Sequence, residues 1–313
     1  MKDACRTVFR KVTIYYLLTF SNYDYFMRIF LNMVNPDILA VAYGLASASF
    51  WGTSDFSGGF VTKTSSVFGV LFVANITGTV ILTIWALWAG GPVPDIYSFI
   101  YGASAGITGL IGLAAFYKGL ANEHMGMVAS LAAVISATLP VFFGMLMEGF
   151  PSYRQVAGFG AAFAALWYLS VSEKSHTIQW RQLGLPATAG IGFGFAFILI
   201  DRAVEQSVFW PLLSAKMTGT VILIILLLIF RIGTMPHKHK YPMVCLIGFF
   251  DAAGTTFYAS AAQVGRLDIS AVLASMHPAI TAFLAWVILR ELLSRRQCIG
   301  VVAALIAIAL IAS

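Results

Sequence analysis

Long apolar runs separated by short polar stretches follow one another along the chain from residue 38 onward. Each run is close to the roughly 20 residues that a helix needs to cross a bilayer core. The runs lack the apolar–polar alternation of barrel strands, so they predict membrane-spanning helices. We predict ten spans, at residues 38–56, 66–89, 96–118, 125–147, 155–172, 183–200, 208–230, 241–262, 269–289 and 297–312.

The composition agrees with a multi-pass membrane protein. The chain has 313 residues, of which 59% are hydrophobic and 10% are charged, whereas a soluble domain carries about 25% charged residues. Ten spans leave short loops and no soluble domain. We assign the net charge of +6 to loops facing anionic lipid and not to nucleic acid, because no stretch interleaves basic and aromatic residues on a soluble surface.

Residues 1–36 differ from the rest, since they are basic and contain only the short apolar run "IYYLLTF". This run is too short to span, and no small-residue cleavage site follows it, which argues against a cleaved signal peptide. Two interpretations stay open for this N-terminal extension. It is either a segment on the membrane surface or an extension upstream of a true start at Met27 or Met33.

The phrase "TGTVIL" occurs twice, at residues 77–82 and 218–223, an offset of 141 residues. A duplication would place other matches at the same offset. Two more pairs do so to within one residue: "FY" at 116–117 and 257–258, and "RQVAG" at 154–158 with "RQCIG" at 296–300. We therefore predict two repeats, one over residues 37–172 and one over residues 180–313.

The number of spans in each repeat fixes the topology. Five is an odd number, so the second repeat must enter the membrane in the opposite sense to the first. The predicted fold class is an all-α integral membrane protein whose ten transmembrane helices form two inverted five-helix repeats. Such inverted repeats are typical of secondary transporters, whose substrate site lies near the membrane midplane.

Two stretches of sequence resemble a known transporter family. They are "SFWGTSDFSGG" in the first predicted span and "ASMHPAITAFLAWVILRELLSRRQCIGVVAALIAIALI" near the end of the chain. With the five-plus-five repeat, the chain over residues 38–313 resembles the EamA family of the drug/metabolite transporter superfamily. The first copy departs from the family pattern, since Ser136 stands where the second copy has Pro278, and its proline is displaced to Pro140.

The resemblance implies an inner-membrane carrier, often an exporter, of a small polar metabolite such as an amino acid. It also implies that the fifth and tenth helices lie at the periphery. The alternative is a lipid-linked or glycolipid flippase-type carrier of the same superfamily, in which Lys216 would meet a phosphate. Proton coupling and homo-oligomer formation stay open, and membrane lipid is an expected partner. No enzymatic activity, cofactor or metal site is predicted, because no catalytic motif, nucleotide-binding loop or ligand cluster is present.

Charged residues within a span are costly and mark functional sites. Asp251 lies near the middle of the eighth span, where it would bind substrate, exchange a proton or form a buried structural pair. Lys216 follows the start of the seventh span by about two turns, and we expect it either to face the cavity, with Asp251 as a partner, or to extend to the interface. The residue 141 positions before Lys216 is Asn75, which favours the cavity.

His277 precedes Pro278 in the ninth span. Proline frees a helix carbonyl, as in the broken helices of transporters, and histidine titrates near neutral pH. We expect either a cavity role or a hydrogen-bonded packing role. Asp55 and Trp51 lie towards the predicted end of the first span, where an interfacial position would also explain them.

The repeated tyrosines, Tyr117 and Tyr258, lie near predicted span ends. They are candidates for gates or for the aromatic belt at the membrane interface.

Membrane orientation gives conflicting expectations. Odd-numbered loops carry ten basic residues: Lys63, Lys118, Lys174, Arg181, Arg231, Lys238, Lys240, Arg290, Arg295 and Arg296. Even-numbered loops carry three: Arg154, Arg202 and Arg266. The positive-inside rule would place both termini outside, whereas the family resemblance and the basic N-terminal extension favour both termini inside.

Overall fold

The computed structural model describes residues 36–89, 93–122, 125–170, 183–229, 231, 234–289 and 295–311. Across these ranges the regular secondary structure is entirely helical. The two interpretations of the N-terminal extension concern residues 1–35, which lie outside the described residues.

The main helices, in chain order, are α2 (Pro36–Thr62), α3 (Val67–Ala89), α4 (Ile96–Asn122), α5 (Met125–Met147), α6 (Tyr153–Ser170), α7 (Gly184–Ala203), α8 (Phe209–Ile224), α9 (Tyr241–Val264), α10 (Leu267–Ala274), α11 (His277–Leu289) and α12 (Arg295–Ile311). A π-helical turn, η2 (Ile225–Ile229), continues α8, and a 3₁₀ turn, η3 (Lys238–Lys240), precedes α9.

Each predicted apolar run coincides with helical structure. Six helical segments are long and apolar enough to cross a membrane: Val67–Ala89, Ile96–Asn122, Val128–Met147, Gly184–Ala203, Phe209–Ile229 and Lys238–Val264. The predicted all-α membrane class is therefore confirmed, whereas the count of ten spans stays a prediction.

The first helix is longer than predicted. We expected a span at residues 38–56, with Asp55 at its end, but α2 continues to Thr62. The helix continues through the glycines at positions 58 and 59. Gly58 packs against the ring of Tyr117, and a Cβ atom at this position would collide with that ring. Small residues let membrane helices approach closely in this way. Asp55 consequently lies almost two turns inside the helix.

The ninth predicted span is interrupted between α10 and α11. Met276 N–H donates to the carbonyl of Leu273 at 3.1 Å and Ala279 N–H to that of Met276 at 2.9 Å, which is the tighter pattern of a 3₁₀ turn. Pro278 follows the interruption and has no N–H to donate. Helix α5 is described as one continuous helix although it contains Pro140.

Polar side chains begin two of the helices. At α4, Ser98 N–H donates to Asp95 Oδ1 at 2.9 Å, and this hydrogen bond lowers the pKa of the exposed Asp95. At α6, Gln155 N–H donates to Ser152 Oγ at 3.3 Å, and Ser152 N–H donates to Gln155 Oε1 at 2.9 Å. The second arrangement is a capping box, so a polar turn starts α6.

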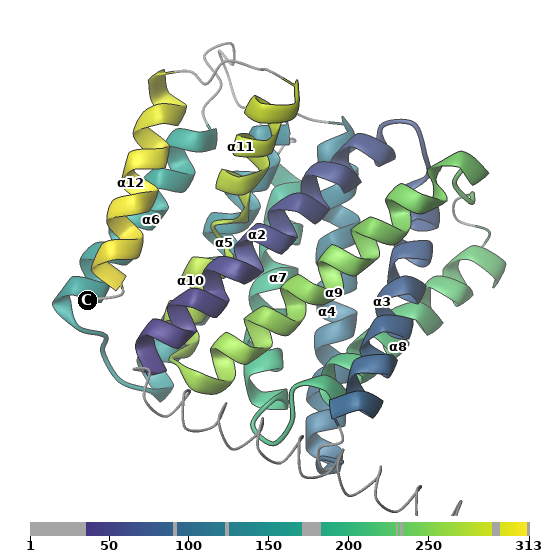
Figure 1. Cartoon of the computed structure of the whole chain (residues 1–313), viewed down its shortest axis with the longest axis horizontal. Helices are drawn as coiled ribbons and strands as arrows, with labels where there is room; N and C mark the ends of the chain where they lie inside the picture. The colour runs from purple at the N-terminus through teal and green to yellow at the C-terminus, as the bar shows by residue number, and fades with distance from the viewer. Residues whose placement is uncertain are drawn as a thin grey trace, which may run out of the picture.

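The helices pack as pairs of segments distant in sequence. Helix α2 runs along α9, α4 packs against α7, and α3 packs against α8. Helices α6 and α12 pack on each other at one side of the molecule (Figure 1). They are the fifth and tenth predicted spans.

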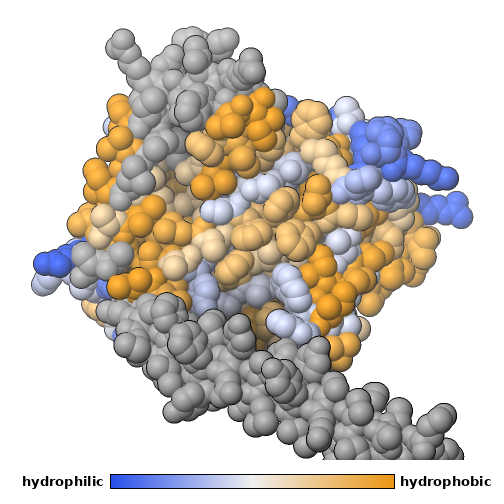
Figure 2. Space-filling view, in the orientation of Figure 1, coloured by the Kyte–Doolittle hydropathy of each residue, from blue (hydrophilic) through white to orange (hydrophobic). Residues whose placement is uncertain are grey.

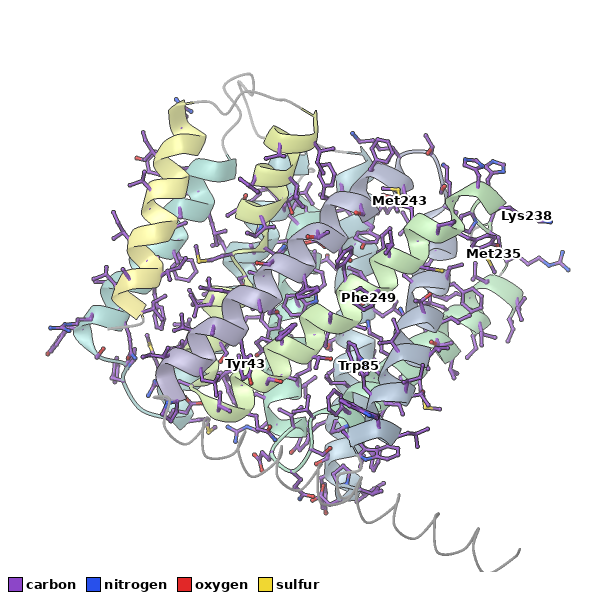
Figure 3. All side chains as sticks on the ribbon, viewed as in Figure 1. Tyr43, Trp85, Met235, Lys238, Met243 and Phe249 are labelled. Atoms are coloured by element: carbon purple, nitrogen blue, oxygen red, sulfur yellow. The ribbon has the colours of Figure 1, made fainter. Side chains whose placement is uncertain are left out.

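The outer surface is apolar where lipid would contact it. Figure 2 shows apolar side chains over much of the visible face, and polar side chains at the end where Figure 3 labels Lys238. On α3, for example, Leu87 and Trp88 are 68% and 76% exposed. Large exposed apolar surface is unfavourable in water but matches the hydrocarbon core of a bilayer.

Candidate functional site

A cavity of about 120 Å³ lies within the helix bundle and is lined by α2, α3, α4, α7, α8, α9 and α11. Six of the eight site residues predicted from the sequence line it: Trp51, Asp55, Asn75, Lys216, Asp251 and His277. These side chains come from five helices. The cavity has room for several water molecules, so it suits a small solute.

Lys216 and Asp251 form a salt bridge between α8 and α9, from Nζ to Oδ2. Their side chains are 13% and 16% exposed. The expectation that Lys216 would extend to the interface is therefore wrong, because the buried carboxylate stabilises its ammonium group inside the bundle. Asn75, on α3, lines the same cavity and is 6% exposed.

His277 and Asp55 form the second pair, between α11 and α2. His277 Nδ1 lies 2.6 Å from Asp55 Oδ2, and the side chains are 6% and 10% exposed. The pair is ionic when the imidazole is protonated. The interfacial position expected for Asp55 is wrong, since α2 carries this carboxylate into the bundle.

Aromatic rings surround the pair between His277 and Asp55. Trp51 stacks on Phe197, with ring centroids 5.5 Å apart, and meets the imidazole edge to face at 6.5 Å. Phe116 approaches the same imidazole from α4 at 6.1 Å. These contacts fix the orientation of the His277 ring and exclude water from part of its surface. Trp51 is therefore a cavity residue and not an interfacial one.

The repeated tyrosines lie beside the cavity without lining it. Tyr117 is 1% exposed and Tyr258 is 0% exposed, so neither is a belt residue. The Tyr258 hydroxyl donates to the carbonyl of Phe197 at 3.0 Å, and its ring packs against both Phe197 and Trp51. Tyr258 thus supports the cavity wall. The gating role of the two tyrosines stays a prediction.

Sequence analysis missed part of the cavity wall. Thr255 lies one turn after Asp251 on α9, and Phe193 and Phe197 lie one turn apart on α7. The spacing of four residues was the available signal, because residues i and i+4 share a helix face.

The cavity lining combines charged and apolar side chains. Both ion pairs line it, and so do the apolar residues Leu110, Leu113, Phe193, Ala196 and Ile200. A solute with polar groups of both signs and a small apolar part would match this surface, since each charge would find an opposite charge already present. Among the described residues, no three His, Cys, Asp or Glu side chains are grouped as metal ligands.

Comparison with known proteins gives one family. Residues 183–313, which include α7 to α12, match the EamA-like transporter family. No curated protein matches the chain.

A solved structure described only as "Crystal structure of protein" has a similar fold. It has a TM-score of 0.72 and 15% sequence identity, covering 87% of this chain and 97% of the other. At this identity the likeness concerns the fold alone. The chain is thus a multi-pass membrane protein in which residues 183–313 match the EamA-like transporter family.

Proposed function

We propose that this protein is a secondary active exporter of a small polar metabolite, such as an amino acid or a related compound. In this proposal ten spans form two inverted halves, residues 37–172 and 180–313, which rock about the central cavity. The observation that carries the proposal is a cavity of about 120 Å³ that holds two ion pairs and is lined by helices of both halves.

The helix packing supports an inverted repeat. In an inverted repeat α2 corresponds to α7 and α4 corresponds to α9. Exchanging these counterparts turns the pair α2–α9 into the pair α7–α4, and both pairs pack closely. The pairs α3–α8 and α6–α12 are each exchanged with themselves, and both are also in contact. A bundle without internal symmetry would have no reason to repeat its contacts in this way.

The repeated phrase gives a direct contact between the two halves. Thr79 Oγ1 lies 3.2 Å from Thr220 Oγ1, and the two residues are 141 positions apart. They are therefore equivalent positions of "TGTVIL". The helices run antiparallel, since Trp85 near the end of α3 meets Phe209 at the start of α8, with ring centroids 6.2 Å apart. Antiparallel contact between equivalent helices supports a pseudo-two-fold axis near this point.

The ion pairs support a charged or zwitterionic substrate. A substrate carboxylate would compete with Asp251 for the Lys216 ammonium, and a substrate ammonium would compete with Lys216 for the carboxylate. The Asp55–His277 pair places a carboxylate beside an imidazole, and in this proposal it is the site of proton exchange. Proton exchange at this pair would couple flux to the pH gradient.

Flux measurements in proteoliposomes test the proposal. We expect Asp251→Asn and His277→Ala to abolish substrate flux or to change its pH dependence, while both variants still insert in the membrane. Arg154→Ala is the control, since this arginine is exposed and does not line the cavity. Wild-type flux at every pH in both cavity variants would remove these residues from the mechanism.

The flippase alternative has less support. It assigned Lys216 to a phosphate, but this lysine is bound to Asp251 on the neighbouring helix. An anionic headgroup would have to displace a carboxylate that is itself largely buried. The small cavity also favours a compact solute.

A further inference from the structure

The end of α5 meets the start of α10 through one arginine. Helix α5 ends at Met147, and the backbone then turns at Gly149, whose φ is +84°. Arg266, just before α10, donates from its guanidinium to the carbonyl of Gly149 at 2.8 Å and to that of Glu148 at 3.4 Å. A cation at this position stabilises carbonyl groups that have no partner within their own helix.

The guanidinium is held in place by a buried carboxylate. Arg266 Nε lies 3.1 Å from Asp268 Oδ1 and Nη2 lies 2.9 Å from Oδ2, and the Asp268 side chain is 0% exposed. This is a two-point contact, which fixes the plane of the guanidinium. Arg266 is thus preorganised to bind the end of α5, because its own helix start already orients it.

The contact is reciprocal. The Glu148 side chain accepts a hydrogen bond from Leu267 N–H, at the first residue of α10, with Oε1 at 3.3 Å, and its Oε2 lies 3.8 Å from Arg266 Nε. Arg202 at the end of α7 lies over the ring of Phe143 on α5, at 5.6 Å. Two arginines of the second predicted half therefore contact the last turns of the same helix of the first half.

The sequence makes this contact one-sided. Helix α5 runs towards the membrane face at which α10 begins, which we call the α5–α10 face. Under an inverted repeat the position equivalent to Arg266 lies 141 residues earlier, at Met125, on the opposite face. Methionine carries no charge and cannot bind backbone carbonyls through paired N–H groups. The opposite face thus has no arginine at the equivalent position.

We propose that Arg266 is a latch that closes the transporter at the α5–α10 face by joining the two halves. The inference rests on the proposed alternating-access function and adds a regulatory asymmetry to it. Opening at this face breaks the bonds from Arg266 to the end of α5, whereas the equivalent position at the other face, Met125, has no guanidinium to form such bonds. Without substrate, the latch therefore biases the protein towards the state closed at the α5–α10 face.

Cysteine labelling tests the latch. A single cysteine is placed in the cavity by Ala105→Cys, in a background where Cys5, Cys245 and Cys298 are replaced by serine. Labelling by a membrane-impermeant maleimide is measured in sealed vesicles of both orientations, without substrate. We expect Arg266→Ala to raise labelling from the α5–α10 face by about tenfold, since a hydrogen bond to a charged group shifts an equilibrium by roughly that factor. Arg266→Lys should have a smaller effect, because it keeps the charge but loses the two-point contact.

Controls separate gating from misfolding. Arg154→Ala removes an exposed basic residue from the same face and should leave labelling unchanged. Arg266→Ala leaves Asp268 buried without its cation, so the double variant Arg266→Ala/Asp268→Asn is measured as well. Labelling of the monodisperse double variant at the wild-type rate would overturn the latch. The labelling needs no transported solute, so absent flux in the wild type would contradict the proposed function and leave the latch to be decided by accessibility.

Discussion

At the scale of single residues, the cavity depends on pairs that only the three-dimensional packing reveals. The sequence identified Asp251, Lys216, His277 and Asp55, because an ionisable group in an apolar run is conspicuous. The sequence analysis suggested that Lys216 pairs with Asp251, but it did not suggest that Asp55 pairs with His277, which lies 222 residues away. Pairing between distant segments depends on how helices cross, and helix crossings are set by small residues and not by the charges themselves.

The Lys216–Asp251 pair gives a prediction that separates structure from function. Asp251→Asn leaves a largely buried ammonium without its counter-charge, so we expect a loss of about 3 kcal/mol in the free energy of unfolding. Adding Lys216→Met removes that unpaired charge and should restore most of the stability. Flux should stay absent in both variants if the pair binds substrate. Thermal unfolding in detergent and proteoliposome flux measure the two effects, and recovery of both together would assign the pair a purely structural role.

Glu148 gives a pH-dependent prediction. Burial raises the pKa of this carboxyl above its usual range, against the lowering effects of the Leu267 N–H and Arg266. The folded protein therefore holds the proton more tightly than the unfolded chain does. The stability from this group is fully present below the ordinary glutamate pKa and is lost as the pH rises through the raised value.

Glu148→Gln should remove this dependence. Unfolding temperatures of both proteins, measured from about pH 4 to about pH 7, should show the wild type losing stability relative to the variant. A relative gain by the wild type over the same interval would contradict this prediction.

At the scale of helices, the sequence predicted the existence of the elements better than their ends and interruptions. Apolar length located every helix, because a bilayer sets the length of a span. It placed the end of α2 too early at the polar and glycine-rich "SDFSGG", since in soluble proteins such residues often end helices. In the bundle, Ser54 Oγ instead donates to the carbonyl of Ile247 on α9 at 3.2 Å. Contacts with a neighbouring helix thus let α2 continue.

The contact between α2 and α11 gives a prediction at this scale. A Cβ atom on Gly52 would lie 2.6 Å from the carbonyl oxygen of His277 and 2.6 Å from Ile280 Cβ. Gly52→Ala should separate the two helices, lower the free energy of unfolding by about 1–3 kcal/mol and disturb the nearby Asp55–His277 pair. Thermal unfolding and flux measure these effects.

Gly160→Ala on α6 is the matched control, because nothing lies within 4 Å of the position that its new Cβ atom would occupy. It should leave unfolding and flux close to the wild type. Equal effects of the two substitutions would show that helix propensity, and not the contact with α11, determines the result.

At the scale of the whole molecule, the described helices divide into a central group and a peripheral pair. Helices α6 and α12 contribute no residue to the cavity, and they pack chiefly on each other. The sequence could not give this arrangement directly, because both helices are as apolar as the central ones. Family resemblance supplied the expectation, and the packing of these described helices agrees with it.

The contact between Thr79 and Thr220 has a consequence for the transport cycle. If the two halves exchange conformations, every distance between the halves becomes the distance between the two counterpart residues. A distance between equivalent positions is exchanged with itself, so the 3.2 Å contact should be the same in both access states. The two threonines would then keep their separation, while contacts between non-equivalent residues of the two halves lengthen or shorten.

Cross-linking tests this constant separation. We expect Thr79→Cys/Thr220→Cys to form a disulfide in vesicles of either access state, with substrate flux close to that of the reduced protein. A bond between non-equivalent residues whose distance changes would hold the carrier in one state, and a bond here would not. Loss of flux on oxidation, restored by reductant, would show that these residues move apart, so that the pivot of the carrier lies elsewhere.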